Sequence, residues 1–177
     1  MPLVQSHGAR PRLASDVFVA PNARVVGDVE MARRSSVWFN STIRADGAPV
    51  RLAEGVDIQD NSLVDSEPGY PCSLAEYTSL GHNATVHGSV LEDHVLIAIS
   101  ATVMRGCHIG AGSIIAANAT LPEGTRVPPR SLVVGAEGRI LRQVTDAEYQ
   151  RIVETAEHYT ELAERYLAVV GPPPEAG

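Results

Sequence analysis

The chain contains no lysine, few aromatic residues and no long apolar run. All 14 of its basic residues are arginines, and 21 acidic residues leave a net charge of −7. Because nucleic-acid-binding surfaces need clustered positive charge, this balance argues against a nucleic-acid partner. No apolar run approaches the ~20 residues of a membrane-spanning helix, and the first residues lack a secretory signal pattern. These absences predict a cytoplasmic protein that binds neither nucleic acid nor membrane.

Cysteine is also scarce, and the two thiols show no ligand or disulfide pattern. Cys72 and Cys107 are far apart and form no C-x-x-C motif. Such isolated cysteines usually act as small buried apolar residues, so we expect two free thiols. Only 5% of the residues are aromatic although 44% are hydrophobic, which predicts a narrow core filled by small aliphatic side chains.

The strongest pattern is an aliphatic residue at every sixth position, beginning at Leu13. The series continues with Val19, Val25, Met31, Val37 and Ile43, resumes with Leu52, Ile58 and Val64, then Leu74, Leu80 and Val86, and ends with Leu91, Ile97, Val103, Ile109, Ile115, Leu121, Val127 and Val133. A period of six fits neither a helix nor an alternating strand. It predicts an all-β solenoid, a left-handed parallel β-helix in which three six-residue sides make one coil.

The pattern divides the chain into four parts. Residues 1–12 are expected to form an extended lead-in, and residues 13–138 the β-helix. Residues 139–169 should hold a linker and one amphipathic helix, because Thr145 and Glu148 form a T-x-x-E capping box before apolar residues at helical spacing. The helix cannot be stable alone in water, so it should pack on the solenoid or on a neighbouring subunit. Residues 170–177, with three consecutive prolines, are expected to be a disordered tail.

Two insertions interrupt the six-residue period. The first lies between Ile43 and Leu52, and the second lies between Val64 and Leu74. Extra residues cannot enter a close-stacked core, so they must loop outward. Insertions in repeat proteins often mark the functional face.

The segment from Leu80 to Gly88 contains the strongest candidate site. His82 and His87 fall on successive sides of the prism, so one metal could bind both only if another subunit closed the gap. Subtracting one coil of 18 residues and the four inserted residues from His87 leads to Asp65, which should lie on the same face about one sheet spacing away. Asp65, His87 and a neighbour's His82 would form a His₂Asp site for zinc, cobalt or ferrous iron.

Four further polar residues lie near this predicted site. Arg44 and Asp46 flank the first insertion and could pair across an interface. Gln59 and Asp60 precede Asp65 and could orient a ligand or bound water. The competing interpretation is that all of these residues, including the two histidines, are ordinary solvated or hydrogen-bonded surface groups.

Three motifs together resemble the gamma-class carbonic anhydrase family. They are Val37-Trp-Phe-Asn-Ser-Thr-Ile-Arg-Ala-Asp46, Asp57-Ile-Gln-Asp-Asn-Ser62 and Gly81-His-Asn-Ala-Thr-Val-His-Gly88. The resemblance covers roughly residues 10–168 and implies a homotrimer with zinc at each subunit interface. It identifies His82 and His87 as metal-binding histidines, Arg44 and Asp46 as an interfacial pair, and Gln59 and Asp60 as the pair beside the metal, where Gln59 would orient water or bicarbonate.

The chain departs from this family at informative positions. Asp65 stands where the family has its first metal-binding histidine, Asp57 replaces a more usual asparagine, and Gly47 offers no carboxylate where an acidic residue occurs in the family. His158, next to Tyr159, could return an imidazole to the site from the C-terminal helix. A carboxylate ligand cancels part of the metal's charge, so the bound water should ionise less readily. We therefore expect slow CO₂ hydration.

Two other function classes remain open from the sequence. One is a trimeric scaffold or binding protein without catalysis. The other is a hydrolase or acyltransferase that acts on another substrate, such as a CoA thioester, because the same solenoid supports that chemistry. Fold alone does not separate these functions.

Overall fold

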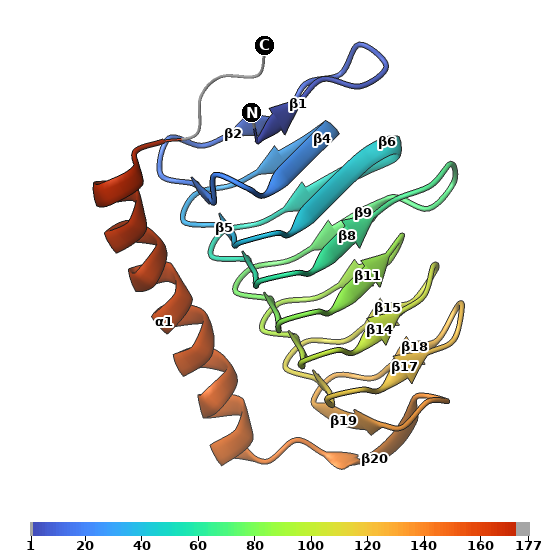
Figure 1. Cartoon of the computed structure of the whole chain (residues 1–177). Helices are drawn as coiled ribbons and strands as arrows, with labels where there is room; N and C mark the ends of the chain where they lie inside the picture. The colour runs from blue at the N-terminus through green and yellow to red at the C-terminus, as the bar shows by residue number, and fades with distance from the viewer. Residues whose placement is uncertain (1, 173–177) are drawn as a thin grey trace.

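The computed structural model describes residues 2–172 and shows a left-handed parallel β-helix flanked by one helix (Figure 1). The predicted fold class is therefore confirmed. Successive coils of the β-helix stack along one axis, and the strands of neighbouring coils pair in parallel. The coils have three faces, as the six-residue period predicts.

Two of the faces share long strands near the N-terminal end. Strands β4 (Arg24–Met31) and β6 (Thr42–Leu52) each run over both faces. The first face, which we call face A, continues with β8 (Leu63–Asp65), β11 (Thr85–His87), β14 (Thr102–Val103) and β17 (Thr120–Leu121), and β1 (Leu3–Val4) pairs with β4 at its other end. The second face, face B, contains β2 (Arg12–Leu13), β9 (Cys72–Leu74), β12 (Val90–Leu91), β15 (His108–Ile109) and β18 (Arg126–Val127).

The third face, face C, is a separate sheet. It is formed by β3 (Phe18–Val19), β5 (Ser36–Val37), β7 (Asp57–Ile58), β10 (Ser79–Leu80), β13 (Leu96–Ile97), β16 (Ile114–Ile115) and β19 (Ser131–Val134), and the antiparallel strand β20 (Arg139–Gln143) closes it. The residues of the six-residue series are buried, apart from the partly buried first member, Leu13, and they form one core. Cys72 and Cys107 are buried free thiols, as expected, and burial raises the pKa of Cys72 to about 12.

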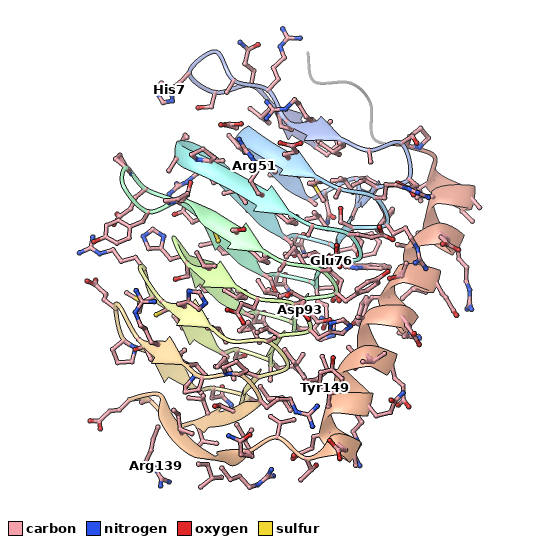
Figure 2. All side chains as sticks on the ribbon, turned by 180° about the vertical axis from the view of Figure 1, so that it is seen from behind. His7, Arg51, Glu76, Asp93, Arg139 and Tyr149 are labelled. Atoms are coloured by element: carbon pink, nitrogen blue, oxygen red, sulfur yellow. The ribbon has the colours of Figure 1, made fainter. Side chains whose placement is uncertain are left out.

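The lead-in contributes more structure than the sequence analysis expected. Its strands β1 and β2 pair with β4, so residues before Leu13 already extend faces A and B. Figure 2 shows His7 on the loop between these strands, at the N-terminal end of the solenoid. The predicted disordered tail lies mostly outside the described residues.

The C-terminal helix α1 (Asp146–Val170) runs back along face C (Figure 1). Thr145 and Glu148 form the predicted capping box, with the Thr145 hydroxyl accepting from the Glu148 N–H. An aromatic cluster of Phe18, Trp38 and Tyr166 joins the helix to the face, with ring centroids 5.0–5.4 Å apart. The helix thus packs on its own solenoid. No helix among the described residues is long and apolar enough to span a membrane.

Both insertions leave the coil as predicted. The pairing of β4 with β6 shifts between Gly27 and Val29, where the first insertion bulges out. The second insertion joins β8 to β9, with a bridge between Glu67 and Tyr70. A Cβ on Gly47 would lie 2.9 Å from the Glu67 Cα, so the two insertions pack against each other. This contact explains why the first insertion has no side chain at Gly47.

The alternation of inward and outward residues can be tested by one pair of identical substitutions. Ile97→Ala removes a fully buried side chain, and we expect it to lower the free energy of unfolding by about 2–5 kcal/mol. Ile99→Ala, at a side chain that is 51% exposed, should cost less than about 1 kcal/mol. Denaturant unfolding followed by circular dichroism would measure both. Equal losses would contradict the assigned register.

Candidate functional site

The predicted site residues occupy face A and the corner turn that joins face C to face A. Arg44, Asp65 and His87 hold equivalent positions in three successive coils, because Arg44 pairs in register with Asp65 and Asp65 pairs with His87. The stacking of Asp65 with His87, counted from the sequence, is therefore confirmed. His82 lies in the corner turn between β10 and β11.

Asp65 is engaged by Arg44 rather than left free for a ligand. The guanidinium donates from Nη2 to Asp65 Oδ2 at 2.8 Å and from Nε to Oδ1 at 3.3 Å. The Ser66 N–H donates to the same Oδ1 at 2.8 Å. Asp65 is buried, and its carboxylate raises the pKa of Arg44 through the hydrogen bonds and the charge attraction. Such a two-pronged pair is the strong form of this interaction.

A second carboxylate reaches His87 from the second insertion. The Glu67 Oε2 atom lies 3.6 Å from His87 Nε2, and Asp65 Oδ2 lies 3.6 Å from His87 Nδ1. Glu67 is itself bound by Arg105, whose Nη1 donates to Oε1 at 2.6 Å and holds the pKa of Glu67 below its usual range. We call Arg44, Asp65, His87, Glu67 and Arg105 the charge ladder.

Sequence reasoning missed Glu67 and Arg105. Glu67 belongs to an insertion, so the six-residue count assigns it no position on a face. Its only sequence signal is its place two residues after Asp65. Arg105 lies one coil above His87, in the turn that joins face A to face B. It meets Glu67 because of the path that the second insertion takes, which the six-residue period does not determine.

Of the remaining predicted residues, His82, Asp60 and Gln59 lie in the corner turns nearer the helix, whereas Asp46 lies beside Arg44. The His82 Nδ1 atom lies 3.1 Å from Asp60 Oδ2, so His82 and His87 face different carboxylates within one chain. Gln59 is buried and its Nε2 donates to Asp57 Oδ1 at 2.9 Å. Asp46 is the outer neighbour of Arg44, with Oδ1 3.7 Å from Arg44 Nε.

Asp57 is fully buried and carries an unusual ionisation. Burial away from water raises the pKa of its carboxyl to about 7, although hydrogen bonds from Ser79 and Gln59 partly oppose the shift. The nearby Tyr159 on α1 has its pKa raised to about 12, first by burial and then by the charges of Asp57 and Asp60. His158 is exposed and its ring contacts that of Tyr159, so the helix presents Tyr159, not the imidazole, to this region.

The donors of one chain do not by themselves fit a three-ligand metal centre. Imidazole and carboxylate are groups that zinc accepts. Among residues 2–172, however, no three histidine, cysteine or acidic side chains come together as a metal-binding group. Asp65 does not fit the role of third ligand while Arg44 covers both of its oxygens. The imidazoles of His82 and His87 remain available, but they face different carboxylates within one chain.

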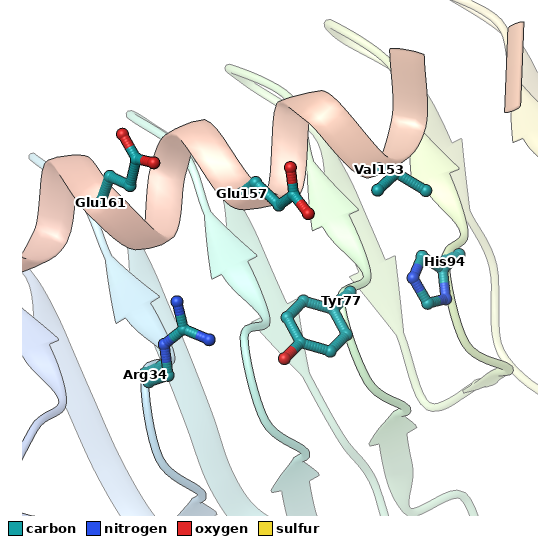
Figure 3. Close-up of a pocket in the computed structure, with 6 residues that line it drawn as sticks. All are labelled: Arg34, Tyr77, His94, Val153, Glu157 and Glu161. Carbon is teal, nitrogen blue, oxygen red and sulfur yellow. The ribbon is translucent and has the colours of Figure 1, made fainter. Parts of the chain in front are cut away.

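A hollow lies between α1 and the turns that join face B to face C, away from the charge ladder (Figure 3). Its lining is largely polar and includes Arg34, Tyr77, His94, Glu157 and Glu161. Arg34 is already near two carboxylates, at 3.9 Å from Glu54 and 3.7 Å from Glu164. None of the predicted site residues lines this hollow.

Comparison with known proteins identifies the family. The chain is 40% identical over 152 residues to "Probable carbonic anhydrase" of Methanocaldococcus jannaschii, which covers 86% of this chain and 96% of that protein. It belongs to the gamma-class carbonic anhydrase family. "Gamma carbonic anhydrase 1, mitochondrial" of Arabidopsis thaliana is 35% identical over 89% of the chain, which spans 60% of that relative.

The repeats and the fold are also shared with proteins named as transferases. The family model "Bacterial transferase hexapeptide (six repeats)" matches residues 88–123. The crystal structure of a hexapeptide transferase family protein from Anaplasma phagocytophilum superposes with a TM-score of 0.90 at 30% identity, covering 93% of this chain and 98% of that one. The anhydrase family therefore shares its scaffold with a second function class.

The buried Asp57 carboxyl predicts a stability that falls as pH rises. Its folded pKa of about 7 exceeds the ordinary value of 3.8, so the folded state keeps a proton that the unfolded state loses. Stability is then lost between about pH 4 and pH 7. We expect Asp57→Asn to stabilise the protein relative to wild type at pH 8, by up to about 4 kcal/mol, and much less at pH 4.

Denaturant unfolding at the two pH values measures this difference. Ser79→Ala serves as the converse variant, because it removes a donor to the carboxylate and should destabilise more at pH 8 than at pH 4. An Asp57→Asn variant whose effect does not change with pH would contradict the buried, partly protonated carboxyl.

Proposed function

We propose that this protein is a homotrimeric, gamma-carbonic-anhydrase-like metalloprotein with a slow reversible CO₂ hydration activity. The observation that carries the proposal is the register of face A, which places His87 above the position of the family's first metal-binding histidine. The family membership supports carbonic anhydrase chemistry, and the separation of His82 from His87 within one chain supports a site completed by a neighbouring subunit.

His87 of one subunit and His82 of the next would hold the metal. Zinc is the proposed ion, and cobalt and ferrous iron accept the same donors. When bound, such an ion lowers the pKa of bound water and supplies hydroxide at neutral pH. Asp60 lies beside the His82 Nδ1 atom and would orient that imidazole, as carboxylates do for metal-binding histidines.

The neighbouring residues position and neutralise rather than react. Gln59 is held by Asp57 at the corner that bears His82, and its amide would orient water or bicarbonate. Arg44 neutralises Asp65. We therefore expect a cause of slow CO₂ hydration other than coordination of the metal by the Asp65 carboxylate. A guanidinium beside the site repels a divalent cation. Slow hydration then follows from weak metal binding and a missing imidazole more than from a poorly ionised water.

A trimeric scaffold without catalysis is the second candidate. The charge ladder supports it, because Asp65 and Glu67 are each paired with an arginine of the same chain. A CoA-dependent acyltransferase or thioesterase is a third candidate, supported by the transferase named among the structural neighbours. Binding of acetyl-CoA by the purified protein would favour that third function.

Metal content and CO₂ hydration test the proposal directly. Protein purified without chelators should contain zinc or take it up, and His87→Ala should abolish this binding. Asp65→His should raise the CO₂ hydration rate by about tenfold or more, because it restores a neutral imidazole ligand. Elemental analysis and stopped-flow hydration measure the two effects.

His108→Ala is the matched control, because His108 is bound to Glu92 on face B, outside the charge ladder. It should change neither metal content nor rate. Wild-type protein that neither contains nor accepts zinc would refute the metalloprotein and favour the scaffold. Zinc-loaded protein that stays inactive even with Asp65→His would refute only the anhydrase activity.

A further inference from the structure

The two carboxylates of the charge ladder on face A are each paired with an arginine of the same chain, although Arg105 also contacts Glu123, with Nε 3.1 Å from Oε2. The two carboxylates that face His87 are Asp65 and Glu67, and each is bound by its own guanidinium, at 2.8 Å from Arg44 and 2.6 Å from Arg105. His87 lies 3.6 Å from both carboxylates, farther than a hydrogen bond. Both acidic groups near this imidazole are therefore already neutralised by positive charge from the chain itself.

The pairing of Arg44 with Asp65 is favoured by register as well as by charge. The two residues occupy the same position in adjacent coils, so their Cα atoms are about one sheet spacing apart. The guanidinium fork then reaches both carboxylate oxygens without leaving face A. The Asp65 side chain is 11% exposed and Arg44 is 52% exposed, so the carboxylate is the more buried partner of the pair.

A metal ion would have to compete with this guanidinium for the oxygens of Asp65. A carboxylate oxygen must approach zinc to about 2.0–2.2 Å. Arg44 already donates to both oxygens of the carboxylate, and its positive charge would repel a divalent cation a few ångströms away. Ser66 also donates to Oδ1, which removes a further lone pair from use.

Arg44 has an alternative partner if it is displaced. The Asp46 Oδ1 atom lies 3.7 Å from Arg44 Nε, on the first insertion and closer to solvent. If Arg44 released Asp65, it would still have a carboxylate partner. It would lose its two hydrogen bonds to the buried Asp65 carboxylate but keep an ion pair with Asp46.

We propose that Arg44 acts as a built-in competitor for the metal, excluding it from Asp65 and thereby setting the metal affinity of the His87 site. Arg44 is a positioning residue in this role, since it acts through Asp65. The inference rests on the proposed function only in assigning His87 as a metal ligand. It makes the wild-type ligand set the two histidines, with Asp65 joining them when Arg44 is removed.

Zinc affinity in four proteins tests this exclusion. The proteins are wild type, Arg44→Gln, Asp65→Asn and the double variant, each titrated with zinc against a chromogenic chelator. Arg44→Gln should tighten zinc binding by about 10- to 100-fold, because it removes a repelling charge and frees a carboxylate ligand. Asp65→Asn should weaken zinc binding by the wild type only through the Arg44 charge that it leaves unpaired, whereas in the Arg44→Gln background it should remove a ligand and most of the gain.

Two further variants separate charge from general disruption. Arg44→Lys keeps the positive charge and should gain less affinity than Arg44→Gln. Arg51→Gln is the matched control on the same strand, since Arg51 pairs with Asp28 and Glu30 away from His87, and it should leave zinc affinity unchanged. Circular dichroism melting and size-exclusion chromatography would confirm that each variant is folded and assembled like wild type.

The outcomes distinguish this inference from the proposed function. A loss on Asp65→Asn that is as large in the wild type as in the Arg44→Gln background, or no gain on Arg44→Gln while His87→Ala still abolishes binding, would overturn the exclusion and leave the metalloprotein intact. If wild type binds no zinc but Arg44→Gln does, the exclusion stands and the wild type is not a metalloprotein. If neither binds zinc, both proposals are wrong.

Discussion

The in-register stacking of successive coils is the constraint on which the rest of this structure depends. Each coil contributes its inward aliphatic residue to one continuous core, and parallel hydrogen bonds hold equivalent positions one sheet spacing apart. A side chain on an outer face therefore has fixed neighbours, one coil below and one above. The charge ladder is a direct result, because Arg44, Asp65 and His87 share one column of face A.

The two insertions turn this regular scaffold into a site. The core tolerates no extra residues, so both insertions leave the coil near the same part of the solenoid and pack on each other through Gly47. The second insertion carries Glu67 back over His87. Face C is shaped differently, because α1 covers it and buries Asp57 and Gln59 beneath aromatic and aliphatic side chains. The corner that bears His82 joins these two environments.

The carboxylate at position 65 determines the local electrostatics of its column. In this chain the carboxylate is paired with the guanidinium of Arg44, a neighbour with which it is in register. The same carboxylate that looks like a metal ligand in a residue list is, in the folded chain, half of an ion pair. Family membership is thus compatible with a site whose metal affinity is set by its own arginine.

Much of this arrangement could be predicted from the sequence. The six-residue period determined the β-helix, the buried aliphatic column and the position of Asp65 beneath His87, because backbone register depends only on counting residues along regular coils. The capping box of Thr145 and Glu148 determined the start of the helix in the same local way. The family motifs added the candidate site residues but not their partners.

Only the tertiary structure decided how the charged side chains are shared. Arg44 has Asp46 beside it in sequence and Asp65 beside it in space, and the buried carboxylate forms the closer pair. Glu67 reaches His87 because its insertion folds back over face A, outside any period. Long side chains and loops choose partners in three dimensions, according to burial and reach. A repeat pattern fixes where a residue's Cα lies, but it does not fix which charge its side chain meets.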